Sequence, residues 1–107
     1  MTFTVTILYP NKEDTIFNMK HYLDVHMPLA EKMWKPAGLL EWKLVEYSTG
    51  PDEKKPTFCV SNTMLWKDSA SYYAASARDK SVEIFDDLVN VCNYEPIFLG
   101  GNVVSRG

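Results

Sequence analysis

The sequence predicts an α+β fold of the ferredoxin-like type, with segments in the order β-α-β-β-α-β. Threonine alternates with large apolar residues over residues 2–9, which is the two-residue period of a strand. Apolar residues recur at three- and four-residue steps over residues 18–34, the period of a helix that faces a core. Two alternating segments, a second helical region and a last apolar segment follow. Helix-joined strand pairs of this kind form a four-stranded antiparallel sheet with both helices on one face.

The first strand ends at Pro10-Asn11, and the following helix begins at Asn18, a residue type that caps helix N-termini. Pro28 lies inside this helix. It cannot donate a backbone hydrogen bond, and its ring clashes with the carbonyl four residues earlier, that of Asp24. We therefore expect a kink beside His26, with a freed carbonyl and room for a small molecule.

Residues 40–47 and 58–66 alternate apolar with polar or small residues and form the second and third strands, joined by a polar loop over residues 48–56. A helix and then a short helical segment follow, and their candidate N-caps are Asp68 or Ser69 and Asp79 or Ser81. The last strand spans residues 94–104. Gly100-Gly101 interrupts it, which indicates a bulge or a close backbone approach.

One face of this sheet is left without cover from its own chain. If the strands keep a regular register, that face carries Val45, Tyr47, Cys59 and Leu65. An exposed, partly apolar face usually marks an interface, and two-fold pairing is the simplest way to cover it. The sequence therefore predicts a homodimer that forms through the sheet face.

Length and composition bound the class of protein. All 107 residues are expected to form one domain, residues 1–107, because this length supports one core and leaves no room for a second. The net charge is −3 and the basic residues are scattered, which argues against nucleic acid as a partner. No apolar run approaches the roughly 20 residues that cross a bilayer, and the N-terminus lacks a secretory signal. We expect a cytoplasmic protein with no membrane partner, in which Cys59 and Cys92 are reduced.

Three motifs resemble those of EthD-like proteins, members of the dimeric α+β barrel superfamily. They are Leu8-Tyr9-Pro10-Asn11 at the end of the first strand, Tyr22-x3-His26-Met27-Pro28-Leu29 in the helix, and Asn93-Tyr94-Glu95-Pro96 before the last strand. The helix motif is the most specific, and the likeness in length and element order covers nearly the whole chain. The resemblance implies a ferredoxin-like monomer, a homodimer of facing sheets, and a pocket between helices and sheet in each subunit.

The same resemblance implies a range of activities. Relatives are linked with degradation of ethers or small aromatic compounds, and the wider superfamily includes isomerases, cyclases, decarboxylases, dehydratases and cofactor-free oxygenases. Many relatives resemble Gly-Pro-His-Ala-x-Glu-Ile after the second helix, where this chain reads Ala77-Arg78-Asp79-Lys80-Ser81-Val82-Glu83-Ile84. The second histidine of that pattern is absent, so a mechanism with two histidines is not carried over.

His26 and Tyr22 are the catalytic candidates. They stand four residues apart, so on a helix the imidazole and the phenol share the face that turns toward the core. Imidazole exchanges protons near neutral pH, and burial favours the neutral form that a base needs. Tyr22 would orient His26 or a substrate oxygen. The alternatives are a core histidine bonded to a backbone carbonyl and a packing tyrosine with a solvated hydroxyl.

Aromatic and apolar side chains are expected to line the substrate pocket: Tyr9, Met33, Trp66 and Tyr72. Their flat or apolar surfaces suit a hydrophobic or aromatic small molecule. Adjacent helix positions do not share a face, so Tyr73 should point away from the core where Tyr72 faces it.

No metal site and no cofactor are expected. His21 lies five residues before His26, off its face, and is expected to be solvated, so the two histidines do not converge on one metal. We expect no acidic partner for His26, since Asp86-Asp87 is typical of a polar helix flank. No helix follows Gly100-Gly101, so this pair does not form a phosphate-binding loop.

These observations favour a cofactor-independent enzyme that acts on a small cyclic or aromatic molecule. His26 would serve as general acid/base, and Tyr22 or another phenol would position an enol or phenol oxygen. The reaction would be an isomerisation, cyclisation, dehydration or oxygenation, within lyase or oxidoreductase chemistry. The alternative is a non-catalytic module that binds a hydrophobic small molecule or serves in assembly. Haem binding, with His26 as axial ligand, is a third interpretation.

Overall fold

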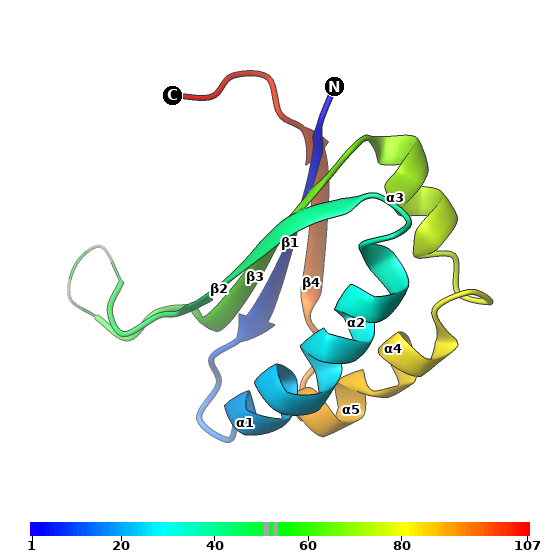
Figure 1. Ribbon diagram of the computed structural model, residues 1–107. Helices are drawn as coiled ribbons and strands as arrows, with labels where there is room; N and C mark the ends of the chain where they lie inside the picture. The colour runs from blue at the N-terminus through cyan, green and yellow to red at the C-terminus, as the bar shows by residue number, and fades with distance from the viewer. Residues whose placement is uncertain (51, 53) are drawn as a thin grey trace.

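The computed structural model describes residues 1–50, 52 and 54–107 and has an α+β architecture. Four antiparallel strands form one sheet in the order β2-β3-β1-β4, and the helices cover one of its faces (Figure 1). The strands are β1 (Phe3–Pro10), β2 (Leu39–Glu46), β3 (Phe58–Trp66) and β4 (Ile97–Asn102). The predicted ferredoxin-like element order is confirmed. The predicted loop at 48–56 includes residues 51 and 53, which lie outside the described residues.

The central strands β1 and β3 carry the core on their helix-facing side. Burial alternates along β1, and the inward positions are Phe3, Val5, Ile7 and Tyr9. Residues paired across an antiparallel ladder point to the same face. The register pairs Tyr9 with Val60 and Ile7 with Asn62, so the side chain of Asn62 also faces the helices.

One helical segment crosses this face of the sheet. It comprises α1 (Met19–His21), the π-helical turn η1 (Tyr22–His26) and α2 (Met27–Trp34), and the Asn18 side chain caps it by accepting a hydrogen bond from the His21 N–H. The N–H of Met27 donates to the carbonyl of Tyr22, five residues earlier. Where a proline kink was predicted, the backbone thus forms a wider π turn just before Pro28. A π turn of this kind accommodates a break in the helical hydrogen-bond ladder.

Three shorter helices complete the layer: α3 (Ser69–Ala75), α4 (Val82–Asp86) and α5 (Leu88–Val91). Asp68 caps α3 by accepting from the N–H of Ser71, and Ser81 precedes α4. The buried Ser81 hydroxyl accepts from Trp34 Nε1 and donates to the carbonyl of Ala75, which joins α4 to α2 and α3. No helix among the described residues is long and apolar enough to cross a membrane.

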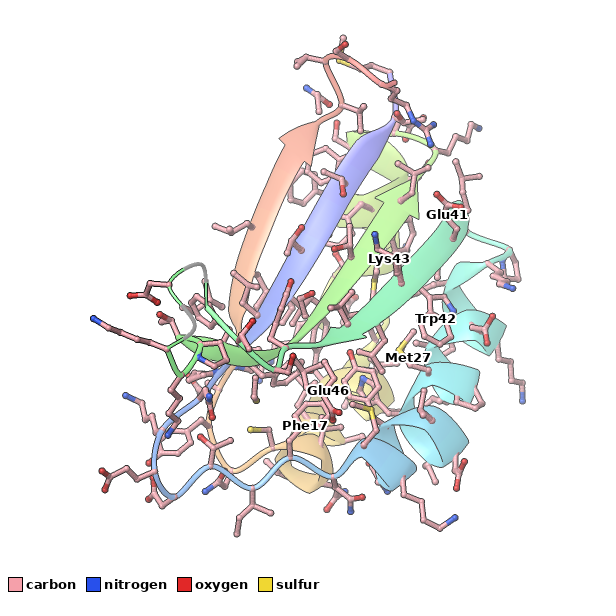
Figure 2. The ribbon with its side chains drawn as sticks, turned by 90° about the vertical axis from the view of Figure 1, so that its left-hand side faces the viewer. Phe17, Met27, Glu41, Trp42, Lys43 and Glu46 are labelled. Carbon is pink, nitrogen blue, oxygen red and sulfur yellow. The ribbon has the colours of Figure 1, made fainter. Side chains whose placement is uncertain are left out.

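The other face of the sheet is uncovered, as predicted, and Figure 2 looks onto it. Val45, Tyr47 and Leu65 lie on it, and β4 adds Ile97 and Leu99, which are 46% and 55% exposed.

The prediction that Cys59 lies on this face is wrong. The register shifts between Tyr9 and Pro10, which leaves Cys59 outside the regular pairing. Its side chain packs against the core cluster, and its thiol lies 3.5 Å from the carbonyl oxygen of Tyr9.

The glycine pair of β4 does not form a bulge. The pairing of β1 with β4 runs without a shift, with Val5 opposite Gly100 and Thr4 opposite Gly101. Gly100 instead makes room for an aromatic ring, because a Cβ atom there would lie 2.8 Å from Cζ of Phe3, whereas a Cβ at Gly101 would meet nothing within 4 Å. Of the two predicted alternatives, a close approach is the correct one, and it involves a side chain.

We therefore expect Gly100→Ala to lower the free energy of unfolding by about 1–3 kcal/mol, because the buried Phe3 ring must move. Gly101→Ala is the matched control and should change it by less than about 0.5 kcal/mol, as for other open positions. Urea denaturation of both variants measures the difference. Equal stability of the two would contradict this packing.

Candidate active site

Two histidines of the helical segment meet on one carboxylate. Nε2 of His21 lies 2.9 Å from both Oδ1 and Oδ2 of Asp87, and Nδ1 of His26 lies 2.9 Å from Oδ2. The prediction that His21 is off the face of His26 is wrong. Hydrogen bonds of a π turn join residues five apart, so positions i and i+5 come onto one side.

Asp87 stands at the junction between α4 and α5, with its side chain 14% exposed. Asn90 Nδ2 also donates to its Oδ1, at 3.0 Å. The predicted polar flank is correct for the exposed Asp86 and wrong for Asp87, which is the acidic partner of His26 that the sequence did not predict. Asp87 lies 61 residues from His26 in the chain, and no local spacing could indicate the pair.

The imidazole of His26 is held in one orientation and is neutral at neutral pH. Burial lowers its pKa, and this effect outweighs the hydrogen bond and the negative charge of Asp87, which raise it. Since the carboxylate accepts a hydrogen bond, the proton of the neutral ring is on Nδ1. Within the described part of the chain Nε2 makes no hydrogen bond, and its lone pair is available as a base.

Tyr22 packs against His26, with ring centroids 5.1 Å apart, and is itself buried. Its hydroxyl accepts a hydrogen bond of 2.8 Å from Asn62 Nδ2, and the same amide contacts the sulfur of Met27 at 3.4 Å. Met27 projects from the helical segment toward the sheet (Figure 2). Burial raises the pKa of Tyr22, so the phenol keeps its proton.

Three buried polar atoms on this side of the sheet have no hydrogen-bond partner among the described residues: Tyr9 Oη, Asn62 Oδ1 and Trp66 Nε1. Burial raises the pKa of Tyr9, so its hydroxyl also stays protonated. Buried polar groups nearly always find partners in protein, water or ligand. These atoms are therefore the ones that a bound polar molecule would satisfy.

Asn62 was missing from the predicted site. The sequence does contain a sign of it: Asn62 is a polar residue at an inward-facing position of an alternating strand, between the apolar residues Val60 and Met64.

The predicted site residues fall into separate groups. Tyr9, Tyr22 and His26 are neighbours, with ring centroids of Tyr9 and Tyr22 5.9 Å apart. Trp66 and Tyr72 form a second aromatic pair, at 5.3 Å, next to Phe3. As expected for adjacent helix positions, Tyr73 is 64% exposed.

Met33 belongs to neither group. It lines a hollow of about 500 Å³ between α2 and α3, and none of the other predicted site residues lines this hollow. The sequence placed Met33 on the core-facing stripe of the helix but could not show which end of the core it would reach.

Within residues 1–50, 52 and 54–107, the side chains are not arranged for metal binding or for nucleophilic catalysis. No group of three or more His, Cys, Asp or Glu side chains there is placed to hold a metal ion. Nε2 of His21 and Nδ1 of His26 are instead hydrogen-bonded to the carboxylate of Asp87. Burial raises the pKa of the Cys59 thiol, which disfavours the nucleophilic thiolate.

Solved structures of other proteins share the fold of this chain. No family model matches the sequence, and no curated protein matches it. An EthD-like protein from Ralstonia eutropha superimposes with a TM-score of 0.87 at 21% identity, over 99% of this chain and 95% of that one. The chain has the fold of EthD-like proteins. An ethyl tert-butyl ether D (EthD) family protein from Bacillus halodurans gives a TM-score of 0.74 at 22% identity, over 97% of this chain and all of the other.

More distant structures with this fold include two enzymes and a dimer. A hydroxynitrile lyase from Passiflora edulis has a TM-score of 0.65 at 11% identity, covering 99% and 95% of the two chains. A cofactor-independent oxygenase from Streptomyces nogalater has a TM-score of 0.62 at 9% identity, covering 98% of this chain and 93% of the oxygenase. A dimeric ferredoxin-like protein from Jannaschia has a TM-score of 0.65 at 15% identity, covering 95% of this chain and 98% of that protein. The predicted ferredoxin-like fold is therefore confirmed, and structures with this fold carry more than one chemistry.

The lowered pKa of His26 predicts how stability depends on pH. Its value in the unfolded chain is about 6.5, so as the pH falls below about 6.5 the unfolded chain takes up a proton that the folded protein binds less readily. The free energy of unfolding should therefore fall between about pH 7 and pH 5.

In His26→Gln this fall should be smaller, since the amide does not titrate. Urea denaturation of both proteins at the two pH values measures it. An equal or larger fall in the variant would contradict the burial of a neutral imidazole.

Proposed function

We propose that this chain is an EthD-like enzyme, one domain over residues 1–107, that transforms a small cyclic or aromatic molecule by general acid/base chemistry without a cofactor. The observation that carries the proposal is the buried, neutral imidazole of His26. Asp87 holds its Nδ1–H, and its Nε2 is unoccupied within the described part of the chain. This is the arrangement of a base held in the tautomer that accepts a proton at Nε2.

In the proposed mechanism Nε2 of His26 removes a proton from a carbon or hydroxyl of the substrate and later returns it. The Asp87 carboxylate stabilises the imidazolium formed in between. The Tyr22 hydroxyl, which already accepts a hydrogen bond from Asn62, would donate a hydrogen bond to the oxygen on which negative charge develops. Proton transfer by a positioned group supplies about 10²–10⁴-fold, which suits an isomerisation, cyclisation or dehydration.

The proposed substrate is hydrophobic or aromatic and carries at least one polar group. The proposed contacts are aromatic, from Tyr9 beside Tyr22 and from the pair Trp66 and Tyr72. Met33 lines a separate hollow of about 500 Å³, which is proposed as a second apolar subsite. Oδ1 of Asn62 is an unpartnered acceptor, and the hydroxyl of Tyr9 is an unpartnered donor. A hydroxyl or carbonyl on a flat ring would satisfy both kinds of group.

The structures that share the fold include different enzymes and indicate no one reaction for this chain. A hydroxynitrile lyase and a cofactor-independent oxygenase share the fold, at identities of 11% and 9%. Each of these reactions is an analogy for this chain. Oxygenation would additionally require a substrate whose stabilised carbanion can itself reduce oxygen.

We also propose that the chain forms a homodimer through the uncovered sheet face. Exposed apolar side chains on this face, Ile97 and Leu99 among them, support the proposal, as does the dimeric relative. A sheet covered by helices on one face and by a second copy on the other has no apolar face in water.

His26→Gln tests the enzymatic function. Imidazole NMR signals are first used to find which of a panel of small phenols and lactones binds, and turnover is then followed for that class. We expect kcat to fall by about 10²–10⁴-fold in the variant while the fold, checked by circular dichroism, is kept. Val25→Ala, at a half-exposed position of the same π turn, is the matched control and should keep its activity. Full activity of His26→Gln would overturn the assignment, and binding without any turnover in the wild type would favour a non-catalytic binding module.

Leu99→Lys tests the dimer, because it places a charge in the proposed interface, where removal from water is costly. Sedimentation velocity should show a dimer for the wild type and a monomer for the variant. Val89→Lys, at a position on α5 that is 79% exposed, should remain dimeric. A dimeric Leu99→Lys protein or a monomeric wild type would contradict the proposed interface.

A further inference from the structure

We propose that His21 is a positioning residue of this site: it holds the Asp87 carboxylate against His26 and is coupled electrostatically to the His26 imidazole across this carboxylate. The proposal rests on the proposed function, in which neutral His26 is the base. It goes beyond that function by giving a role to a second histidine, whose ring bonds to Asp87 and to none of the unpartnered atoms of the site.

The geometry shows how the carboxylate is held. Nε2 of His21 is equidistant from both oxygens of Asp87, at 2.9 Å, and Asn90 donates to Oδ1 from the other side. Oδ2 is thereby directed at Nδ1 of His26, also at 2.9 Å. A carboxylate with three donors from two separate elements has little freedom to rotate, so the ring of His26 is held as well.

The surroundings of the cluster disfavour a proton on His26. One carboxylate balances one imidazolium, and a second positive charge beside the first is disfavoured. The His21 side chain is 22% exposed and that of His26 only 5%, so an imidazolium at position 26 loses more hydration. Burial lowers the pKa of His26, and a positive charge on the neighbouring imidazole lowers it further, so His26 stays available as a base.

Other charged groups near the cluster do not change this balance. On the same helical segment, Lys20 pairs with Asp24 at 2.7 Å, and both side chains are exposed to solvent. From α5, Asn90 contributes a neutral amide, and Tyr22 keeps its phenol proton. Among the described residues, Asp87 is the one carboxylate bonded to either histidine.

The test measures the titration of each imidazole by NMR in the intact protein without any ligand. In His21→Gln the amide can still donate to Asp87 but cannot carry a charge. The titration midpoint of His26 should rise by about 0.5–1 pH unit, the effect of removing a unit charge a few ångströms away in a partly solvated site. His21→Arg carries a positive charge and should leave the midpoint at or below its wild-type value.

Lys20→Gln is the matched control, because it removes a neighbouring charge that does not contact Asp87, and it should not move the midpoint. Circular dichroism checks that each variant is folded. A rise in His21→Gln together with no rise in His21→Arg supports the proposal. An unchanged midpoint in His21→Gln, or an equal rise in Lys20→Gln, overturns it.

Turnover separates this proposal from the proposed function. With a substrate from the panel, the acid limb of the kcat profile should move to higher pH in His21→Gln, in parallel with the His26 midpoint. If the midpoint moves but turnover does not depend on His26, the proposed function is overturned and the electrostatic coupling of the two imidazoles is supported.

Discussion

The carboxylate of Asp87 is the group on which the candidate site depends. It accepts hydrogen bonds from two imidazoles of the helical segment that crosses the sheet, and it is itself held by Asn90. An imidazole as buried as that of His26 needs a partner, and a backbone carbonyl would have made it a structural core residue. A carboxylate fixes the tautomer of the imidazole and also stabilises the positive charge that the imidazole acquires when it accepts a proton.

The meeting of His21 and His26 at Asp87 depends in turn on the π turn before Pro28. In a regular α-helix, residues five apart diverge around the axis, and His21 would face solvent. The wider turn of η1 brings His21 and His26 to the same carboxylate. A proline that interrupts the helical ladder thus has a consequence beyond a bend, because it changes which side chains share a face.

The two faces of the sheet meet different requirements. The helix-facing side combines aromatic packing with polar atoms that lack partners, such as Asn62 Oδ1 and Trp66 Nε1, an arrangement suited to a small molecule with both apolar and polar parts. The opposite side exposes apolar residues of β4 and is suited to a large, flat partner such as a second copy of the chain. The fold thus presents one face for the proposed chemistry and another for the proposed assembly.

Local patterns in the sequence determined the elements of this protein and their order. The alternation in β1, the caps Asn18 and Asp68, and the helical stripe each act over a few residues, and that range is sufficient to predict a ferredoxin-like fold with His26 and Tyr22 on its inner side. The tertiary structure alone decided that Asp87 reaches His26, that a register shift moves Cys59 to the core, and that Gly100 accommodates Phe3. Each of these depends on segments tens of residues apart meeting in space, and hydrogen bonding and packing at such meetings leave no periodic signal in the chain.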